Sequence, residues 1–283
     1  MKNIGIDIGA SHISCGLYNT STQILENKIY ILNKMDKTVD IDVSTRHFIN
    51  IIINLIDRLI IENNINIDEI SSIGLGCPGG TDKGNGIFLG SSSLNVSEIN
   101  FRIELKKYNT KVFVENDCTC AGICESYINN LNNFIMFTLG SGLGVSYMQD
   151  YKCIDEIVWD IFKINKKMGN THDKYIKSFN SLSKRYNEVK NENYARCEIF
   201  KCLDKGDKDA KNILKNYIIN FIDGIKIIQS HYPVRDIVIG GGMSEYSKHF
   251  IYDIRKEFQN INIHIAKYRN DSGIIGGALL EII

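Results

Sequence analysis

The polar residues Glu115, Asn116 and Asp117 stand near the middle of the chain, directly after an alternating apolar run at residues 111–114. Carboxylates and amides can bind ligands or perform acid–base chemistry. Residues 118–129 carry small and apolar side chains every three or four positions, which predicts a helix. Asp117 is therefore expected where a strand ends and a helix begins. Helix capping and a functional site at the strand end are both consistent with this pattern.

Three turns rich in small residues could bring backbone N–H groups close to an anion. The first spans residues 7–11, after an apolar strand, and Ser11 adds a hydroxyl donor. The second spans residues 140–144, after the apolar run at 134–139. The third spans residues 240–242 and precedes a predicted helix, an arrangement that suits a flat ring or an anion. Each could equally be an ordinary tight turn.

Asp7 stands at the start of the first turn. Its carboxylate repels a phosphate group but could hold a hydrated magnesium ion beside one. The alternative is a solvated aspartate at a hairpin turn, and the motif by itself favours that alternative. A strand, a small-residue turn and a second strand occur at the start of each half of the chain, which indicates a weak internal duplication. Two such turns facing each other could clamp a polyphosphate.

Hydrophobic periodicity predicts a mixed α/β chain that positions these turns. Strands are predicted at residues 4–9, 13–18, 24–32, 72–76, 87–89, 111–114, 134–139, 145–148, 236–239 and 261–265. Helices are predicted at residues 45–63, 101–108, 118–129, 154–167, 171–187, 194–203, 207–232, from 244 onward and at 274–283.

The composition excludes several classes of protein. The chain has 283 residues, with 33 basic and 33 acidic side chains, so no excess positive charge favours nucleic acid as a partner. No apolar run is long enough for a membrane span. The first strand begins so early that a signal peptide is not expected, and we predict a cytoplasmic protein. The eight cysteines do not resemble a small disulfide scaffold, and in a cytosolic protein they are expected to be reduced, buried or metal-bound.

In this order and spacing, the motifs resemble those of the ROK sugar kinases, within the actin/Hsp70/hexokinase-like superfamily. The resemblance covers essentially the whole chain. It rests on the segments 7–11 (the family usually has Asp-x-Gly-Gly-Thr), 76–80, 115–117, 140–144, 240–242 and 276–278. In the repressor branch of the family, a DNA-binding module precedes the first strand. Because the sequence starts at that strand, the kinase branch is expected rather than the repressor branch.

The resemblance implies an α/β fold of the two-domain actin-like ATPase (ribonuclease H-like) type. Mixed sheets flanked by helices would enclose an interdomain cleft. The N-terminal α/β domain is expected at residues 1–115, with the C-terminal helix 272–283 packing back onto it. A larger C-terminal α/β domain is expected at residues 116–271.

The resemblance also implies roles for individual residues. Asp117 matches the catalytic base that accepts the proton of the sugar's 6-hydroxyl group. The expected sugar ligands are Gly80, Ser92, Asn116, Asp117 and Glu156, with Asp173 in place of the family's second sugar-binding glutamate. The expected ATP ligands are Gly9 and Ser11 in the first phosphate loop, Ser141 and Gly142 in the second, and Gly241 and Gly242 on the adenosine side. Asp7 would hold Mg²⁺ through water.

One stretch departs from the family pattern. ROK proteins usually carry Gly-Glu-x-Gly-His followed by a cysteine cluster, which together bind structural zinc. Here the nearest match is residues 155–159, in which Trp159 replaces the histidine, and no Cys-x-Cys cluster follows. We therefore expect ATP and Mg²⁺ as cofactors and no structural zinc. Cys118, Cys120 and Cys124 are expected to be core residues of their helix.

The substrate prediction depends on residues 92–96, Ser-Ser-Leu-Asn-Val. ROK glucose kinases tend to carry Pro-Asn-Leu there, whereas N-acetylmannosamine kinases carry segments similar to Ser-Thr-Lys-Leu. The resemblance thus predicts a kinase that makes N-acetylmannosamine 6-phosphate, in sialic acid catabolism. A glucose or N-acetylglucosamine kinase, or a non-catalytic sugar or nucleotide sensor of the same fold, remains open. Because family members are often dimers, a homodimer is expected.

Overall fold

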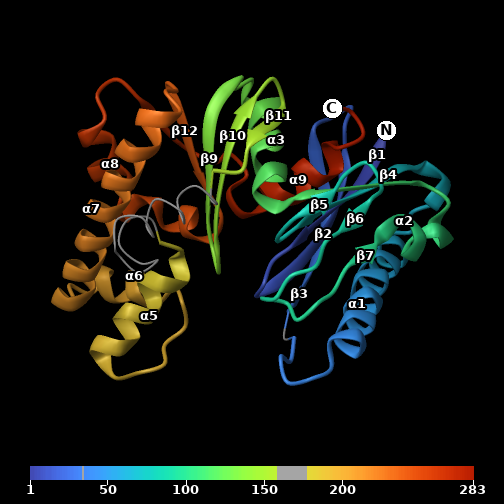
Figure 1. The fold of residues 1–283 in the computed structure, drawn as a ribbon, viewed down its shortest axis with the longest axis horizontal. Coiled ribbons are helices and arrows are strands. Elements are labelled where there is room, and N and C mark those ends of the chain that lie inside the picture. Colours follow the sequence, from blue (N-terminus) through green and yellow to red (C-terminus); the bar gives the residue numbers. More distant parts are fainter. Residues whose placement is uncertain (34, 158–176) are drawn as a thin grey trace. The chain divides into compact units, whose positions relative to one another are not determined.

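The computed structural model describes residues 1–33, 35–157 and 177–283 (Figure 1). The chain divides into two compact units, one comprising Met1–Ile128 with Asp271–Ile283 and the other Asn129–Asn270. The first unit thus includes the helix that follows residue 116, which the sequence analysis assigned to the second domain. Within the described ranges, none of the helices combines the length and apolar character that crossing a bilayer requires.

The first unit is built on a five-stranded sheet with the order β3-β2-β1-β4-β8. Its strands are β1 (Lys2–Ile8), β2 (His12–Asn19), β3 (Ile24–Leu32), β4 (Ile70–Cys77) and β8 (Lys111–Asn116). Strands β1, β4 and β8 are parallel, while β2 and β3 run antiparallel to their neighbours. The carboxyl ends of the three parallel strands therefore meet at one edge of the sheet.

Two helices pack on this sheet: the long helix α1 and the short, tightly packed helix α9. Helix α1 (Ile41–Glu62) begins where the Asp40 carboxylate accepts hydrogen bonds from two backbone N–H groups, and it buries an apolar stripe. Helix α9 (Ser272–Leu279) lies against the sheet. A Cβ atom on Gly5 would lie 1.8 Å from the Ile274 carbonyl oxygen, and one on Gly74 would lie 1.9 Å from that of Gly277. Glycine at these two positions lets the helix backbone pack directly on the strands.

Smaller elements complete the first unit. They are the 3₁₀ helices η1 (Ile67–Glu69) and η2 (Lys106–Tyr108), helix α2 (Phe101–Glu104), helix α3 (Asp117–Asn129), and a small sheet of β5 (Thr81–Asp82), β6 (Ile87–Phe88) and β7 (Ile99–Asn100). Cys118, Cys120 and Cys124 of α3 are buried, so their prediction as core residues is confirmed.

The second unit repeats the same strand order, β11-β10-β9-β12-β13. Its strands are β9 (Asn133–Leu139), β10 (Leu143–Gln149), β11 (Lys152–Asp155), β12 (Asp236–Gly240) and β13 (Asn262–Ile265). As in the first sheet, the first three strands along the chain pair antiparallel, here β9 with β10 and β10 with β11. The two later strands pair in parallel, β12 with β9 and β13 with β12. The predicted internal duplication is confirmed by this shared topology.

The helices of the second unit bury aromatic side chains against its sheet. They are α5 (Phe179–Lys190), α6 (Glu198–Asp204), α7 (Lys208–His231) and α8 (Ile251–Glu257), with the 3₁₀ helix η3 (Gly242–His249). A further 3₁₀ turn, η4 (Arg269–Asp271), contains the last residues of the second unit and Asp271, with which the first unit resumes. Phe137 of β9 packs edge-on against Phe221 of α7, with ring centroids 5.2 Å apart.

Four predicted helices of this unit are wrong at their starts or in their type. Residues 152–155 form β11 because they pair with β10, and the predicted helix 154–167 otherwise falls mainly outside the described residues. Helix α5 begins at Phe179, after the capping residue Ser178. Helix α6 begins only at Glu198, and η3 is a 3₁₀ helix rather than the expected α-helix.

Candidate functional site

Acidic residues gather at the carboxyl edge of the first sheet. In the strand register Asp7 pairs with Gly76, which pairs with Glu115, so the two carboxylates belong to one row across β1, β4 and β8. Gly273, in the first turn of α9, leaves room for Asp7: a Cβ there would lie 2.7 Å from the carboxyl carbon. The charges of Asp117 and Asp271 also act on Asp7.

The pKa of Asp7 is raised to about 7, first by burial and then by repulsion from Asp117 and Asp271. The side chain is only partly covered, since the residue is intermediate in exposure. Asp271 was not predicted from the sequence, and its carboxylate accepts a hydrogen bond from Lys28 Nζ at 2.7 Å. The solvated aspartate at a hairpin turn therefore stays an alternative to the magnesium-binding role.

Asn116 provides the cap of helix α3. Its Oδ1 accepts hydrogen bonds from the backbone N–H groups of Cys118 at 2.9 Å and Thr119 at 3.1 Å. Its Nδ2 donates to the carbonyl oxygen of Gly79 at 3.3 Å, which joins it to the loop after β4. Asp117 is the first residue of the helix, and its Oδ1 accepts from the N–H of Cys118 at 2.8 Å. Capping thus belongs mainly to the amide of residue 116.

Glu115 is buried and paired, a feature that the sequence analysis missed. Lys83 Nζ lies 2.5 Å from its Oε2, and its Oε1 accepts the N–H of Asn116 at 2.7 Å. The carboxylate is 6% exposed, whereas the lysine is 55% exposed. A buried carboxylate requires such partners. The charged residue among the apolar residues of a parallel strand was the available signal.

The first small-residue turn is held by a neighbouring strand. Asn33, directly after β3, donates from Nδ2 to the Gly9 carbonyl oxygen at 3.0 Å and from its backbone to the Ser11 carbonyl oxygen at 2.9 Å. Ser11 Oγ and His12 Nδ1 are 3.1 Å apart. Asn33 was not predicted, because its position beside the turn follows from the pairing of β2 with β3.

The predicted sugar ligands lie in several parts of the chain. Gly80 is half-buried, and its carbonyl oxygen accepts the N–H of Leu89 at 3.0 Å, beside the Gly79 contact of Asn116. Ser92 is exposed in the turn closed by residues 91 and 96. Glu156 is half-buried just beyond β11 in the second unit. Asp173 and Trp159 lie outside the described residues.

The second turn, in the other unit, surrounds open space. Among the residues that the structure describes, none has an atom within 4 Å of a Cβ placed on Gly140 or Gly142, so packing among them does not require glycine there. The turn is closed by the Gly140 N–H, which donates to the Gly142 carbonyl oxygen at 3.1 Å. Ser141 Oγ accepts a hydrogen bond from Arg196 Nη2 at 2.9 Å. No motif in the sequence indicated this arginine.

The third turn follows β12, which lies parallel beside β9, so the second and third turns share the carboxyl edge of the second sheet. Gly241 has a φ of +74°, and a Cβ there would lie 2.7 Å from the Leu139 nitrogen. Its glycine is thus explained by the turn itself. A Cβ on Gly242 would only make ordinary contact, 3.9 Å from Phe179 Cδ1.

No group of three histidine, cysteine, aspartate or glutamate side chains forms a metal-binding cluster in residues 1–33, 35–157 and 177–283. The region from residue 158 to 176, where the family's zinc ligands would fall, is outside these ranges. A zinc-free protein therefore stays a prediction.

Two sheets of identical strand order, each carrying small-residue turns at its carboxyl edge, define an α/β protein of the actin-like ATPase fold class. The particular family follows from the sequence. The ROK family model matches residues 3–155 and 174–282, so the chain belongs to the ROK family.

An uncharacterized protein of Clostridium perfringens is 25% identical over 288 residues, covering 96% of this chain and 94% of its own. Among solved structures, a ROK family glucokinase from Streptomyces griseus, in complex with glucose and AMPPNP, matches with a TM-score of 0.79 and 17% identity over 99% of both chains.

Two further structures represent different branches of the family. A proposed N-acetylmannosamine kinase from Listeria monocytogenes has a TM-score of 0.76 and 17% identity over 100% of both chains. A ROK family transcriptional regulator, a homologue of the E. coli MLC protein, has a TM-score of 0.75 and 16% identity over 99% of this chain and 78% of its own. At these identities the likeness establishes the fold alone.

Proposed function

We propose that this protein is an ATP-dependent sugar kinase that phosphorylates the 6-hydroxyl group of a hexose or an N-acetylhexosamine. The observation that carries the proposal is the arrangement of Asn116 and Asp117 at the end of β8. The amide of Asn116 caps helix α3 with two hydrogen bonds, so the helix does not depend on Asp117 for its cap. Asp117 stands beside the Gly79–Gly80 loop and the acidic edge that includes Asp7.

In this proposal Asp117 orients the attacking hydroxyl group and accepts its proton. A general base needs hydrogen-bond reach to that proton before it needs a tuned pKa. Phosphoryl transfer depends mostly on positioning and charge stabilisation, so a fixed backbone around the base is an advantage. The Asn116 contact with Gly79 supports such rigidity, because it joins the helix start to the loop after β4.

The nucleotide would be bound by the small-residue turns. The open space at Gly140 and Gly142 supports a phosphate-binding role for Ser141 and Gly142, because no side chain in residues 1–33, 35–157 or 177–283 fills it. Gly242 leaves room on the proposed adenosine side, whereas Gly241 maintains the shape of the turn. Gly9 and Ser11 form the first phosphate loop, braced by Asn33.

The acidic edge fits a magnesium ion. Mg²⁺ prefers oxygen ligands and is often held through water by one or two carboxylates. Burial, and after it repulsion from Asp117 and Asp271, raises the pKa of Asp7, and a divalent cation would relieve the repulsion among these carboxylates. Asp7 would hold the ion through water, and the bound ion would supply charge neutralisation at the transferred phosphate.

N-acetylmannosamine is the proposed substrate, and Ser92, Glu156 and Asp173 are the proposed additional sugar ligands. The support is the segment 92–96 and the departure from the zinc motif at Trp159. A homodimer also stays a prediction.

A coupled assay of ATP consumption with N-acetylmannosamine, N-acetylglucosamine, glucose and mannose tests the proposal. Turnover should be greatest with N-acetylmannosamine, and turnover only on another sugar would remove the substrate assignment. Asp117→Asn should lower kcat by about 10²–10⁴-fold while sugar binding persists. Asp68→Asn, on the exposed surface, is the matched control and should leave kcat unchanged.

A non-catalytic sugar or nucleotide sensor is the second candidate. The replacement of the family's histidine by Trp159 favours it, as does the similarity to a transcriptional regulator. A sensor would bind sugar or nucleotide equally in the wild type and in Asp117→Asn and would show no turnover in either.

A further inference from the structure

We propose that Arg196 binds the phosphate chain of the nucleotide, exchanging its hydrogen bond to Ser141 for a non-bridging phosphate oxygen. This inference rests on the proposed function, since it concerns the nucleotide site of the second unit. It adds a charged ligand to a site that otherwise consists of backbone N–H groups and a serine hydroxyl.

The position of Arg196 is set by contacts with helix α5 and with the second small-residue turn, which are themselves joined by a backbone hydrogen bond. Its Nη2 donates to Ser141 Oγ at 2.9 Å, and its carbonyl oxygen accepts the hydroxyl of Ser183 at 2.7 Å. The N–H of Asn180 donates to the Gly140 carbonyl oxygen at 3.1 Å. The guanidinium is thus held beside the open space at Gly140 and Gly142.

A single aromatic ring connects Arg196 with the third turn. The guanidinium carbon lies 5.8 Å from the centroid of Phe179, a distance at which a cation is attracted to an aromatic face. The same ring faces Gly242, where a Cβ would lie 3.9 Å from Phe179 Cδ1. Arg196 therefore lies close to both the proposed phosphate turn and the proposed adenosine turn of this unit.

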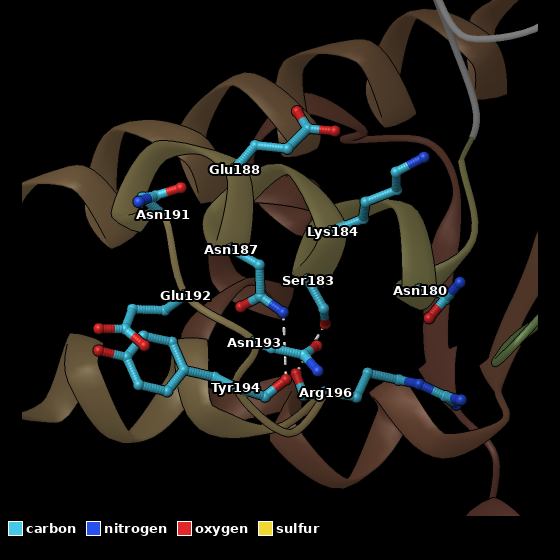
Figure 2. A pocket seen from close by; sticks show the side chains of 10 residues that line it. All are labelled: Asn180, Ser183, Lys184, Asn187, Glu188, Asn191, Glu192, Asn193, Tyr194 and Arg196. Carbon is cyan, nitrogen blue, oxygen red and sulfur yellow. Dashed lines mark hydrogen bonds between the residues drawn. The ribbon is translucent and has the colours of Figure 1, made fainter.

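Figure 2 shows the pocket between α5 and the segment after it. Arg196 and Asn180 lie at one end of this pocket, and Glu192 and Tyr194 lie at the other. The basic end is the end nearer to Ser141, as the Arg196 hydrogen bond requires. An anion is therefore favoured at this end of the pocket.

The charge of Arg196 is poorly compensated. Within the described part of the chain, no carboxylate forms an ion pair with it. Burial lowers the pKa of the guanidinium from its usual value, although arginine stays protonated at neutral pH. A partly desolvated cation that bonds only a neutral hydroxyl gains by exchanging it for a phosphate oxygen, because charge-assisted bonds are the stronger ones.

Arg185, which is exposed on helix α5, offers a matched control. It is paired with Glu188 at 3.2 Å, so its charge is already compensated. Arg196→Gln and Arg185→Gln remove the same charge from the same part of the unit. Arg196→Lys keeps the charge but loses the planar, forked geometry.

The test is isothermal titration calorimetry of ATP and of adenosine at constant Mg²⁺ on the wild type and these three variants. Arg196→Gln should weaken ATP binding by about tenfold or more, the usual effect of losing a hydrogen bond to a charged group. Its adenosine affinity should stay within about twofold of the wild type, so the ATP-to-adenosine ratio falls. Arg196→Lys should be intermediate, and Arg185→Gln should match the wild type.

Three outcomes would overturn the inference. Equal loss of ATP and adenosine affinity in Arg196→Gln would mean that the arginine only supports the fold of the loop. Unchanged ATP affinity in that variant, with the wild type binding ATP tightly, would refute the inference and leave the proposed function standing. A folded wild type that binds neither ATP nor adenosine would refute both.

Discussion

Replacing Asp7 with asparagine should stabilise the protein at pH 8 and have a much smaller effect at pH 5. The pKa of Asp7 is raised from 3.8 to about 7 in the folded protein. Between these two values the folded protein holds a proton that the unfolded chain has released. Stability therefore gains as the pH falls from about 7 toward 4, and the full penalty of the charged carboxylate is present above pH 7.

The size of the effect follows from the shift. Each pKa unit corresponds to about 1.4 kcal/mol, which gives an upper limit of about 4 kcal/mol for Asp7. Because the carboxyl group is partly exposed, solvent screening reduces the expected gain in Asp7→Asn to about 2–4 kcal/mol at pH 8. At pH 5 less than about half of that gain should remain, since most of the wild-type Asp7 is then protonated.

The assay is urea unfolding followed by circular dichroism at pH 5, 6, 7 and 8, with the wild type, Asp7→Asn and the exposed-surface control Asp68→Asn. The relevant quantity is the difference in unfolding free energy between wild type and variant, because carboxylates remote from Asp7 titrate equally in both. The pKa of Asp207, for example, is lowered to about 2, mainly by its hydrogen bond from Lys190.

A difference between wild type and Asp7→Asn that does not change with pH would refute the reasoning, and so would a variant less stable than the wild type at pH 8. Adding Mg²⁺ at pH 8 should stabilise the wild type more than Asp7→Asn if the ion binds at this edge.

Three other substitutions test the remaining contacts. Gly74→Ala should destabilise the protein by about 3 kcal/mol or more, because the new methyl group would collide with the backbone of α9; urea unfolding measures this. Gly142→Ala should change stability by less than about 0.5 kcal/mol but weaken ATP binding by about tenfold, since its methyl group enters space proposed for phosphate. Normal ATP affinity in Gly142→Ala would contradict the assignment of that turn. Asn33→Ala should cost about 1–2 kcal/mol, because the Gly9 carbonyl oxygen loses its buried amide partner; an unchanged melting temperature would show that the brace is dispensable.

Much of the fold was predictable because it depends on local pattern. Apolar runs ending in small or acidic residues correctly indicated β1, β8, β9 and β12, and the repeated strand–turn–strand unit indicated the duplication. The ROK motifs rest on the same local segments, and the family is confirmed. The starts of α5 and α6 were not predictable, because they depend on hydrogen bonds between different elements: Lys177 before α5 accepts one from Tyr217, and Arg196 before α6 accepts one from Ser183.

The sequence by itself determined which small, acidic and apolar residues end the strands, and hence the family and the candidate base Asp117. Only the tertiary structure decided how these residues are supported. It brings Asp271 to Asp7, Lys83 to Glu115 and Arg196 to Ser141. The physical reason is that charge and burial act through space. The pKa of a carboxylate and the charge compensation of an arginine depend on neighbours in the fold, which for Asp7 and Asp271 are more than two hundred residues apart along the chain.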